Sequence, residues 1–372
     1  MNNEDLIIGV HGDDNLVGGR YNVLSSFTLG LLKAFQRAGV TAYKTKRCFE
    51  KNLLPNLTIG FNVSGHETWS EYLKAIPNIM WSVDSVFFQN IELIDKFYTN
   101  PRFVLFNVSP SDNEALSEFY PQLKQSYLPH AVDLELWGKQ DVEKEYDIVF
   151  LSSIEDYETK IEELRLSLPK STFDLLMMIY DTWLAVPNLS FWELYQIFKN
   201  QSSLSLNLVD YNFVFKNISY LVTYTKRVQA VEKLKDFNVK VFGNKTWAKY
   251  VSGNVQYMGE CDLLESINVV NKAKIVLHSQ PSQIPSGLHE RVLNASAVET
   301  FVMSSDSQSI KNEFGECMGY YSNKTLENLP EEIEYYLKHA DERISKAKDA
   351  RKIVAEYHTW DVRAQQILNM LP

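Results

Sequence analysis

Short hydrophobic segments alternate with polar or helical segments through most of the chain. Residues 6–10 are uniformly apolar, and a glycine-rich polar loop at 11–20 follows them. Residues 23–38 then carry apolar side chains at helical spacing and stop at Gly39, a residue typical of helix ends. Further strands are predicted at 57–63, 78–83 and 103–108, with a last strand exit at 127–133. Such alternation predicts a parallel sheet covered by helices.

The second half of the chain repeats this alternation after a charged linker at 138–145. A strand predicted at 146–153 opens it, and residues 157–235 are mostly helical in pattern and rich in aromatics. This stretch is longer than one strand–helix–strand unit needs, so part of it is interpreted as an insertion. Residues 329–371 predict one or two amphipathic helices. Later strands are predicted at 239–242, 255–257, 274–278 and 300–304. Expected buried positions of the C-terminal helices include Tyr335, Leu337, Ile344, Ile353 and Leu368.

Composition narrows the class of protein. The length of 372 residues suggests two domains, and the 45% hydrophobic and 23% charged fractions are typical of a globular protein. A net charge of −10 disfavours nucleic acid as a partner. Three distant cysteines without a CxxC motif predict neither a disulfide framework nor a zinc site. No segment has the length of a signal peptide core or a spanning helix, so a cytoplasmic protein is expected, with any membrane contact peripheral.

The segment 279–306 carries the most chemistry. A strand predicted up to residue 278 ends in a Pro/Ser/Gly loop, a helix is expected to begin near Leu288, and a new strand follows at Thr300. The loop therefore delivers a helix N-terminus, which favours phosphate, to the carboxyl end of a parallel sheet, where α/β proteins bind ligands. Glu290 and Asn294 share one helix face and suit ribose or sugar hydroxyls. Arg291 can pair with a phosphate oxygen.

Residues 287–295, with the sequence GLHERVLNA, resemble the donor-site helix of group 1 glycosyltransferases. The pattern G-x-x-x-R-V-[FL]-x-A is most similar to a subgroup named after a spore-maturation protein. Three other segments agree with the resemblance: an entry strand at 146–153, a V-x-Y-x-G strand and turn at 254–259, and an H-T-[YW]-x-x-R-A segment at 358–364.

The resemblance implies a GT-B fold, an α/β arrangement of two Rossmann-like domains facing a cleft, with a C-terminal helix packing back toward the N-terminal domain. The expected parts are an acceptor domain at 1–140, a nucleotide-sugar-binding domain at 145–350 with a helical insertion at about 157–235, and a C-terminal helix at 351–372. It further implies hexosyl transfer from a nucleoside diphosphate sugar, UDP foremost, to an acceptor hydroxyl of a glycan, protein or small molecule. No metal or separate cofactor is expected, because the helix dipole and basic side chains stabilise the leaving diphosphate.

Candidate site residues follow from these positions. Donor binding is expected at Gly287, Leu288, His289, Glu290, Arg291 and Asn294. Lys245, after the strand at 239–242, is a candidate for diphosphate contact or simply an exposed lysine. Gly18 and Gly19 would form a cleft wall or a surface loop, with Arg20 reaching a phosphate or solvent. Asp84 and His66, after predicted strands, are the candidate catalytic residues facing the acceptor. The alternatives are a helix N-cap for Asp84 and a structural role for His66, as for His11 and His130.

Two departures from the resembled enzymes keep other functions open. Asn294 stands where many of them carry a glutamate that holds the ribose, and no glycine occurs near Val298 or Glu299. A non-catalytic nucleotide-sugar-binding or scaffold protein, or a GT-B-fold nucleotide-sugar epimerase, would also fit. The donor sugar, the acceptor, the stereochemical outcome and any homo-oligomer stay open.

Overall fold

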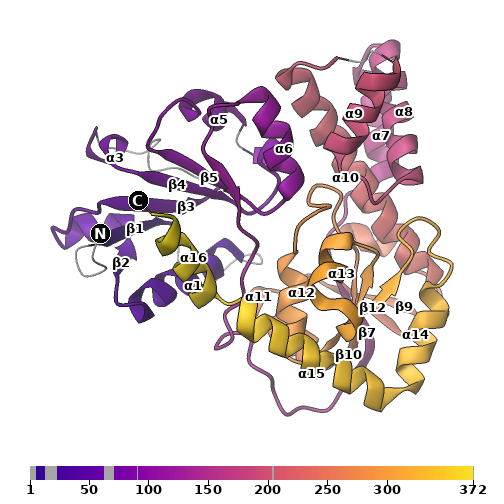
Figure 1. Cartoon of the computed structure of the whole chain (residues 1–372). Coiled ribbons are helices and arrows are strands. Elements are labelled where there is room, and N and C mark those ends of the chain that lie inside the picture. The colour runs from indigo at the N-terminus through magenta and orange to yellow at the C-terminus, as the bar shows by residue number, and fades with distance from the viewer. Residues whose placement is uncertain (1–5, 13–22, 63–70, 90, 203–204, 372) are drawn as a thin grey trace. The chain divides into compact units, whose positions relative to one another are not determined.

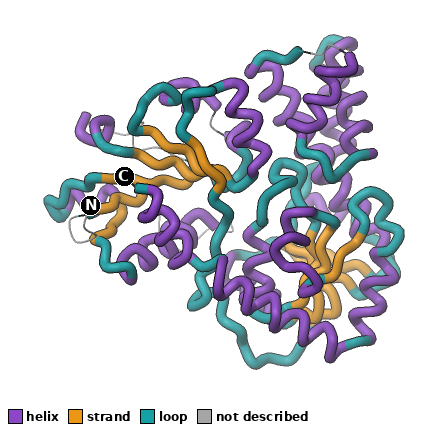
Figure 2. The backbone as a smooth tube through the Cα atoms, viewed as in Figure 1, coloured by secondary structure: helices purple, strands orange, loops and turns teal. Residues whose placement is uncertain are grey.

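The computed structural model describes residues 6–12, 23–62, 71–89, 91–202 and 205–371, and the chain divides into two compact units. Unit 1 comprises Met1–Leu136 and Val354–Pro372, and unit 2 comprises Trp137–Ile353. Each unit is built on one sheet whose strands are flanked by helices (Figures 1 and 2).

The sheet of unit 1 has six parallel strands in the order β2-β1-β3-β4-β5-β6. Its strands are β1 (Ile7–His11), β2 (Thr41–Lys44), β3 (Leu57–Phe61), β4 (Asn78–Ser82), β5 (Phe103–Asn107) and β6 (Gln125–Tyr127). The strands predicted near 57, 78 and 103 are confirmed. Strand β2 was not predicted, because its sequence Thr-Ala-Tyr-Lys has no apolar run.

Helices cover this sheet where the apolar spacing predicts them. In α1 (Val23–Arg37), Phe27, Leu31 and Phe35 are buried, whereas Leu24 is 43% exposed. The other helices of unit 1 are α2 (Thr45–Glu50), α3 (Glu71–Ala75), α4 (Val86–Gln89), α5 (Ile91–Phe97), α6 (Pro110–Phe119) and α16 (Trp360–Met370).

Helix α16 completes the core of unit 1 although it lies at the end of the chain. It packs against α1, and the Trp360 ring lies 5.2 Å from Phe27 and 5.8 Å from Trp81, centroid to centroid. A Cβ atom at Gly30 of α1 would collide with the Trp360 ring, so the two helices need glycine there to approach each other. The expectation that the C-terminal helix packs toward the N-terminal domain is confirmed.

The sheet of unit 2 also has six parallel strands, in the order β12-β11-β10-β7-β8-β9. They are β7 (Tyr146–Leu151), β8 (Val239–Phe242), β9 (Val255–Gly259), β10 (Ala273–His278), β11 (Phe301–Ser305) and β12 (Gly319–Tyr321). The first strand of the unit, β7, pairs with β8 on one side and with β10 on the other, so the strand order reverses between β7 and β10. This reversal is the topological switch point, at which open α/β sheets bind their ligands.

The predicted insertion is a set of four helices between β7 and β8: α7 (Tyr157–Ser167), α8 (Lys170–Ala185), α9 (Phe191–Ser202) and α10 (Leu208–Lys233). Aromatic rings fill its interior, among them Trp183, Phe191 and Tyr211. The C-terminal part of α10 packs on the sheet through Val228 and Val231. The remaining helices of the unit are η3 (Lys245–Lys249), α11 (Leu263–Asn271), α12 (Glu290–Ala297), α13 (Gln308–Phe314), η4 (Gly315–Cys317), α14 (Leu329–Lys338) and α15 (Ala340–Tyr357).

The C-terminal region contains three helices, α14, α15 and α16, rather than the one or two predicted. The expected buried positions were wrong for Tyr335 and Ile344, which are 42% and 48% exposed. Tyr336 and Ala347 are buried instead, because these two residues lie on the helix faces that pack into the core of unit 2. Among the described residues, no helix has the length and apolar character needed to cross a membrane.

Candidate functional site

The loop after β10 lies at the switch point of unit 2 and is held in one conformation by a buried glutamine. Gln280 Oε1 accepts a hydrogen bond from His278 Nε2 at 3.0 Å, and the Gln280 backbone N–H donates to Ser305 Oγ at 2.8 Å. Its side-chain amide also donates to the carbonyl oxygens of Ile284 and Gly287. These contacts tie residues 280–287 of the loop to one another and to the neighbouring strand β11.

Helix α12 begins at Glu290, two residues later than predicted, because His289 is its N-cap. His289 Nδ1 lies 2.8 Å from Glu290 Oε2 and 3.3 Å from the backbone nitrogen of Arg291. One ring nitrogen cannot donate to the first and accept from the second at the same time. The shorter, charge-assisted contact favours donation to Glu290, which leaves the Arg291 N–H at the helix N-terminus open to an anion.

Two arginines from distant parts of the chain, Arg227 and Arg291, interact electrostatically with each other. Arg291 Nε lies 3.9 Å from Glu290 Oε1, and its guanidinium donates no hydrogen bond to a described residue. Arg227, on α10, is buried, and its Nη1 donates to the Ser153 carbonyl at 2.7 Å, directly after β7. Burial and, to a smaller extent, the charge of Arg291 together lower the pKa of Arg227 to about 9, against the opposing effect of Glu290. The Arg227 side chain therefore lies within electrostatic range of both α12 residues.

The buried Arg227 Nε has no hydrogen-bond partner among the described residues. An unsatisfied buried donor costs about 1–3 kcal/mol, and the positive charges of Arg227 and Arg291 repel each other. A phosphate group would satisfy the donor and balance the charge. Sequence reasoning missed Arg227 because it lies 60 residues before the start of the motif at Gly287. The available signal was the Lys226-Arg227 pair within the apolar part of α10, because charged side chains are rarely buried unless they have a partner.

The other expected donor residues have different environments. Asn294 follows Glu290 by one turn of α12, is 6% exposed and forms no side-chain hydrogen bond within the described part of the chain. Its amide is therefore available to a ligand hydroxyl. Gly287 and Leu288 are buried; Gly287 contributes its carbonyl to Gln280, and Leu288 contributes apolar packing. Lys245 is exposed at the start of η3, and no described residue pairs with it.

The candidates of the first half belong to unit 1. Gly18, Gly19, Arg20 and His66 lie outside the described residues. Asp84 is half-buried directly after β4, where its carbonyl accepts from Ser82 Oγ at 2.8 Å. Sequence reasoning missed Asp112, a buried carboxylate that accepts the Val86 N–H at 3.0 Å and so fixes the turn that follows Asp84. Burial, with a smaller effect of the Asp84 charge, raises the pKa of Asp112 to about 7, against the opposing hydrogen bond from the Val86 N–H.

His11 and His130, which lie at or after the ends of strands of the first sheet, are both buried. His11, at the end of β1, is buried, and burial lowers its pKa to about 4. His130 Nε2 lies 2.9 Å from the Val83 carbonyl oxygen, which fixes the exit of β4. The structural alternative stated for both residues is therefore the better supported one.

His278 is expected to make the free energy of unfolding depend on pH. Burial, followed by the neighbouring His289, lowers its pKa from 6.5 to about 3. Between these values the unfolded chain binds a proton that the folded chain does not, so stability rises with pH over this range and falls toward acid. We expect the variant His278→Gln to show a shallower loss of unfolding free energy between pH 6.5 and 4 than the wild type in urea titrations. An unchanged slope would contradict a buried neutral His278.

Comparison with known proteins supports the fold. Residues 226–369 match the model of a family described as glycosyl transferase-like, which is less than half of the chain. No curated protein matches. Similar solved structures include sucrose-phosphate synthase from Thermosynechococcus elongatus, at 11% identity and a TM-score of 0.56 over 98% of both chains. An α-glucosyltransferase in complex with UDP and a DNA 13-mer has 10% identity and a TM-score of 0.58 over 98% of both chains. Anabaena HepE, in complex with UDP and glucose, has 8% identity and a TM-score of 0.53 over 98% of both chains.

The fold is therefore the GT-B fold of glycosyltransferases, as the sequence predicted, with two parallel six-stranded sheets flanked by helices. The matched segment begins at Lys226, beside Arg227, and extends through α12 to α16. The narrower resemblance to the spore-maturation subgroup stays a prediction.

Proposed function

We propose that the protein transfers a glycosyl group from a nucleoside diphosphate sugar, with UDP as the nucleotide, to an acceptor hydroxyl. The observation that carries this proposal is the buried Arg227, whose Nε has no partner among the described residues and whose charge interacts with Arg291 at the N-terminus of α12, beside the switch point of a parallel sheet. The presence of UDP in the similar α-glucosyltransferase and HepE structures supports the choice of nucleotide.

The diphosphate would lie against the N-terminus of α12, with the two guanidiniums on its oxygens. As the bond between the sugar and the diphosphate breaks, negative charge grows on the departing phosphate oxygen. Fixed positive charges and N–H dipoles at that place stabilise the transition state more than the ground state. Because the arginines can supply this charge, we propose that the reaction needs no divalent metal ion.

Glu290 and Asn294 would form hydrogen bonds with hydroxyl groups of the donor. Both lie on the same buried face of α12, one turn apart. A carboxylate and an amide together offer acceptors and donors, as a ribose or sugar ring requires. Asn294 replaces a charged carboxylate by a neutral amide, so the site keeps hydrogen-bonding capacity at less negative charge near the phosphates.

The acceptor would be oriented by unit 1, where we keep Asp84 and His66 as the candidate catalytic residues. Asp84 lies at the carboxyl end of β4, and Asp112 fixes the following turn. An acceptor hydroxyl of a glycan, a protein or a small molecule would suit a carboxylate in this place. We propose a cytoplasmic location, with no nucleic acid as partner.

A nucleotide-sugar-binding protein without transfer activity is the second candidate. It is favoured by Asn294 at the place where the resembled enzymes use a glutamate. The absence of glycine near Val298 and Glu299 does not further support this candidate, because Glu299 itself adopts the left-handed backbone conformation that glycine favours, with φ 55°.

The test has two parts, each with UDP-, GDP-, dTDP- and CMP-sugars and with and without EDTA. The first measures the melting temperature of the protein, and the second separates nucleotides and sugars by chromatography after incubation. We expect one UDP-sugar to raise the melting temperature and to release UDP slowly to water, with no effect of EDTA. Binding without any product would favour the second candidate. An isomerised donor would favour an epimerase, and no binding of any nucleotide would contradict the proposed function.

A further inference from the structure

Glu299 has an unusual backbone conformation directly after α12. Its φ of 55° lies in the left-handed region, which costs free energy for a residue with a Cβ atom. Its N–H donates to the Ser296 carbonyl at 3.1 Å, and the next N–H, of Thr300, donates to the Ala295 carbonyl at 3.0 Å. The conformation therefore ends α12 and fixes the direction in which the Glu299 side chain leaves the helix.

The Glu299 carboxylate joins two other parts of unit 2. Its Oε2 lies 2.6 Å from Lys139 Nζ, and its Oε1 lies 3.7 Å from Arg351 Nε on α15. Arg351 also donates to the Ala297 carbonyl at the end of α12. The Glu299 side chain is only 18% exposed, so solvent screens these ion pairs less than it screens surface pairs.

Both partners lie beside the two places where the chain passes between the units. Lys139 belongs to the connecting segment, residues 138–145, which begins just after the boundary at Trp137. Arg351 stands three residues before the second boundary at Val354. The sequence predicted a plain linker at 138–145, but the structure shows a segment docked on unit 2.

Hydrogen bonds hold the connecting segment to the amino end of the sheet. The Gln140 N–H donates to Asn271 Oδ1 at 2.8 Å, and Asn271 Nδ2 donates to the Gly138 carbonyl at 3.3 Å. Lys144 Nζ donates to the Asn271 carbonyl at 2.7 Å and to Thr300 Oγ1 at 3.1 Å. The segment is thus fastened beside the C-terminal end of α12.

Helix α12 connects the proposed nucleotide site at its N-terminus with Glu299 directly after its C-terminus. Its eight residues make a rod of about 12 Å. Arg291, at its N-terminal end, is its one residue that is not fully buried. A packed helix moves as one body, so a shift caused by an anion at its N-terminus reaches Glu299 at the other end.

We propose that Glu299 is a positioning residue that couples the nucleotide at the N-terminus of α12 to the connecting segment and to α15. This inference rests on the proposed function. By linkage, nucleotide binding tightens the Glu299 contacts, and loss of these contacts weakens the response of the connecting segment to nucleotide.

Hydrogen-exchange mass spectrometry with and without UDP tests this coupling, with UDP affinity measured by calorimetry in parallel. In the wild type, UDP is expected to slow exchange in peptides that cover 138–145 by about fivefold or more, the lower end of typical coupling between sites. In Glu299→Gln this slowing should be lost while UDP still binds. Glu299→Gly, which also relieves the backbone, should behave in the same way, so a general loss of stability does not explain the effect.

Glu145→Gln is the matched control. It removes an ion pair with Lys272 at 2.8 Å, at the end of the same segment and without a contact to Glu299, and should respond to UDP as the wild type does. UDP binding that leaves 138–145 unchanged in the wild type, or a response retained in Glu299→Gln, would overturn this inference alone. Failure of the wild type to bind UDP would overturn it together with the proposed function.

Discussion

Arg363→Ala is expected to lower the free energy of unfolding of unit 1 by about 3–5 kcal/mol. The Arg363 side chain is among the largest fully buried ones. Its Nε donates to the Pro129 carbonyl at 2.8 Å, its Nη2 to the His130 carbonyl at 3.1 Å and its Nη1 to the Tyr357 carbonyl at 2.9 Å. Alanine would leave these buried carbonyls without donors and would open a cavity beneath α16.

The same guanidinium also lies 2.7 Å from His358 Nδ1, and the His358 carbonyl accepts the Val132 N–H at 2.9 Å. These contacts give the predicted H-T-W-x-x-R-A segment a structural explanation: it fastens α16 to the exit of the first sheet. Urea denaturation followed by tryptophan fluorescence measures the effect, because Trp360 and Trp81 both lie in this core.

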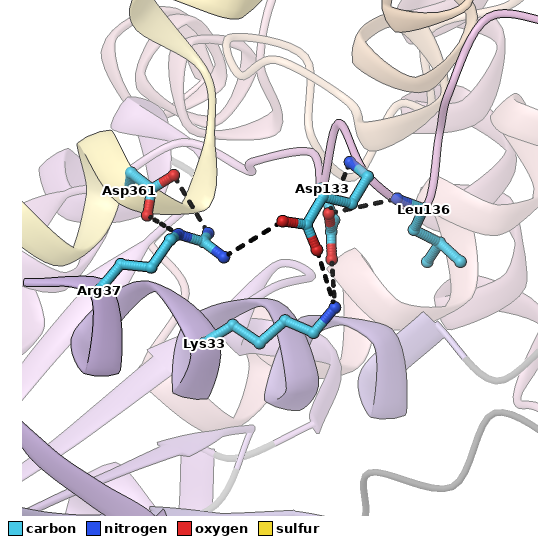
Figure 3. Close-up of polar contacts among 6 residues, drawn as sticks. Lys33, Arg37, Asp133, Leu136 and Asp361 are labelled. Atoms are coloured by element: carbon cyan, nitrogen blue, oxygen red, sulfur yellow. Dashed lines mark hydrogen bonds and ion pairs between the residues drawn. The ribbon is translucent and has the colours of Figure 1, made fainter.

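Arg37→Ala is the matched control, since it removes an exposed arginine contact that joins α1 to the same helix, α16. Arg37 binds Asp361 through two hydrogen bonds, at 2.7 and 3.1 Å, and both side chains are about half exposed (Figure 3). Exposed pairs of this kind contribute about 1 kcal/mol or less. Equal losses in the two variants would contradict a special role for the buried Arg363.

Arg227→Met and Arg291→Ala are each expected to weaken UDP binding by about 10- to 100-fold, the effect of losing a hydrogen bond to a charged group. Methionine keeps the volume and apolar stem of Arg227, so packing on the sheet is retained. It removes the unsatisfied buried Nε, which offsets the loss of the Nη1 hydrogen bond to the Ser153 carbonyl, so the stability of Arg227→Met should lie within about 1 kcal/mol of the wild type. Isothermal calorimetry gives the affinity and thermal unfolding gives the stability.

Arg165→Ala serves as the control for these two variants. It removes an arginine from α7, on the same insertion, that is 54% exposed and, among the described residues, pairs only with Glu162 of its own helix. UDP affinity should not change. If Arg227→Met bound UDP as the wild type does, the buried guanidinium would be structural, and the diphosphate would rest on Arg291 and α12 alone.

Much of the fold could be predicted because local patterns agree with it. The strands at 57–61 and 103–107 are apolar runs between polar segments, and α1 shows regular apolar spacing. The pattern failed where the signal is short or ambiguous. Thr41–Lys44 is a strand only because it pairs with β1 along its whole length. In α14, Tyr335 and Tyr336 are adjacent aromatics, and only tertiary packing on Phe301 decides that Tyr336 is buried.

The candidate site was predictable in part for the same reason. The 287–294 segment lies within one loop and helix, so its spacing carries the information. Arg227 becomes part of the site only because a four-helix insertion returns α10 to the switch point. The role of Glu299 depends on partners 160 residues before it and 52 residues after it, which no local pattern encodes.

A crystal structure of the protein with UDP tests the central claim most directly. The account predicts the diphosphate at the N-terminus of α12, within hydrogen-bond distance of the Arg291 N–H and of the Arg227 and Arg291 guanidiniums, with a ribose or sugar hydroxyl near Asn294. UDP bound elsewhere on the chain, or no UDP bound at concentrations that saturate related enzymes, would contradict it.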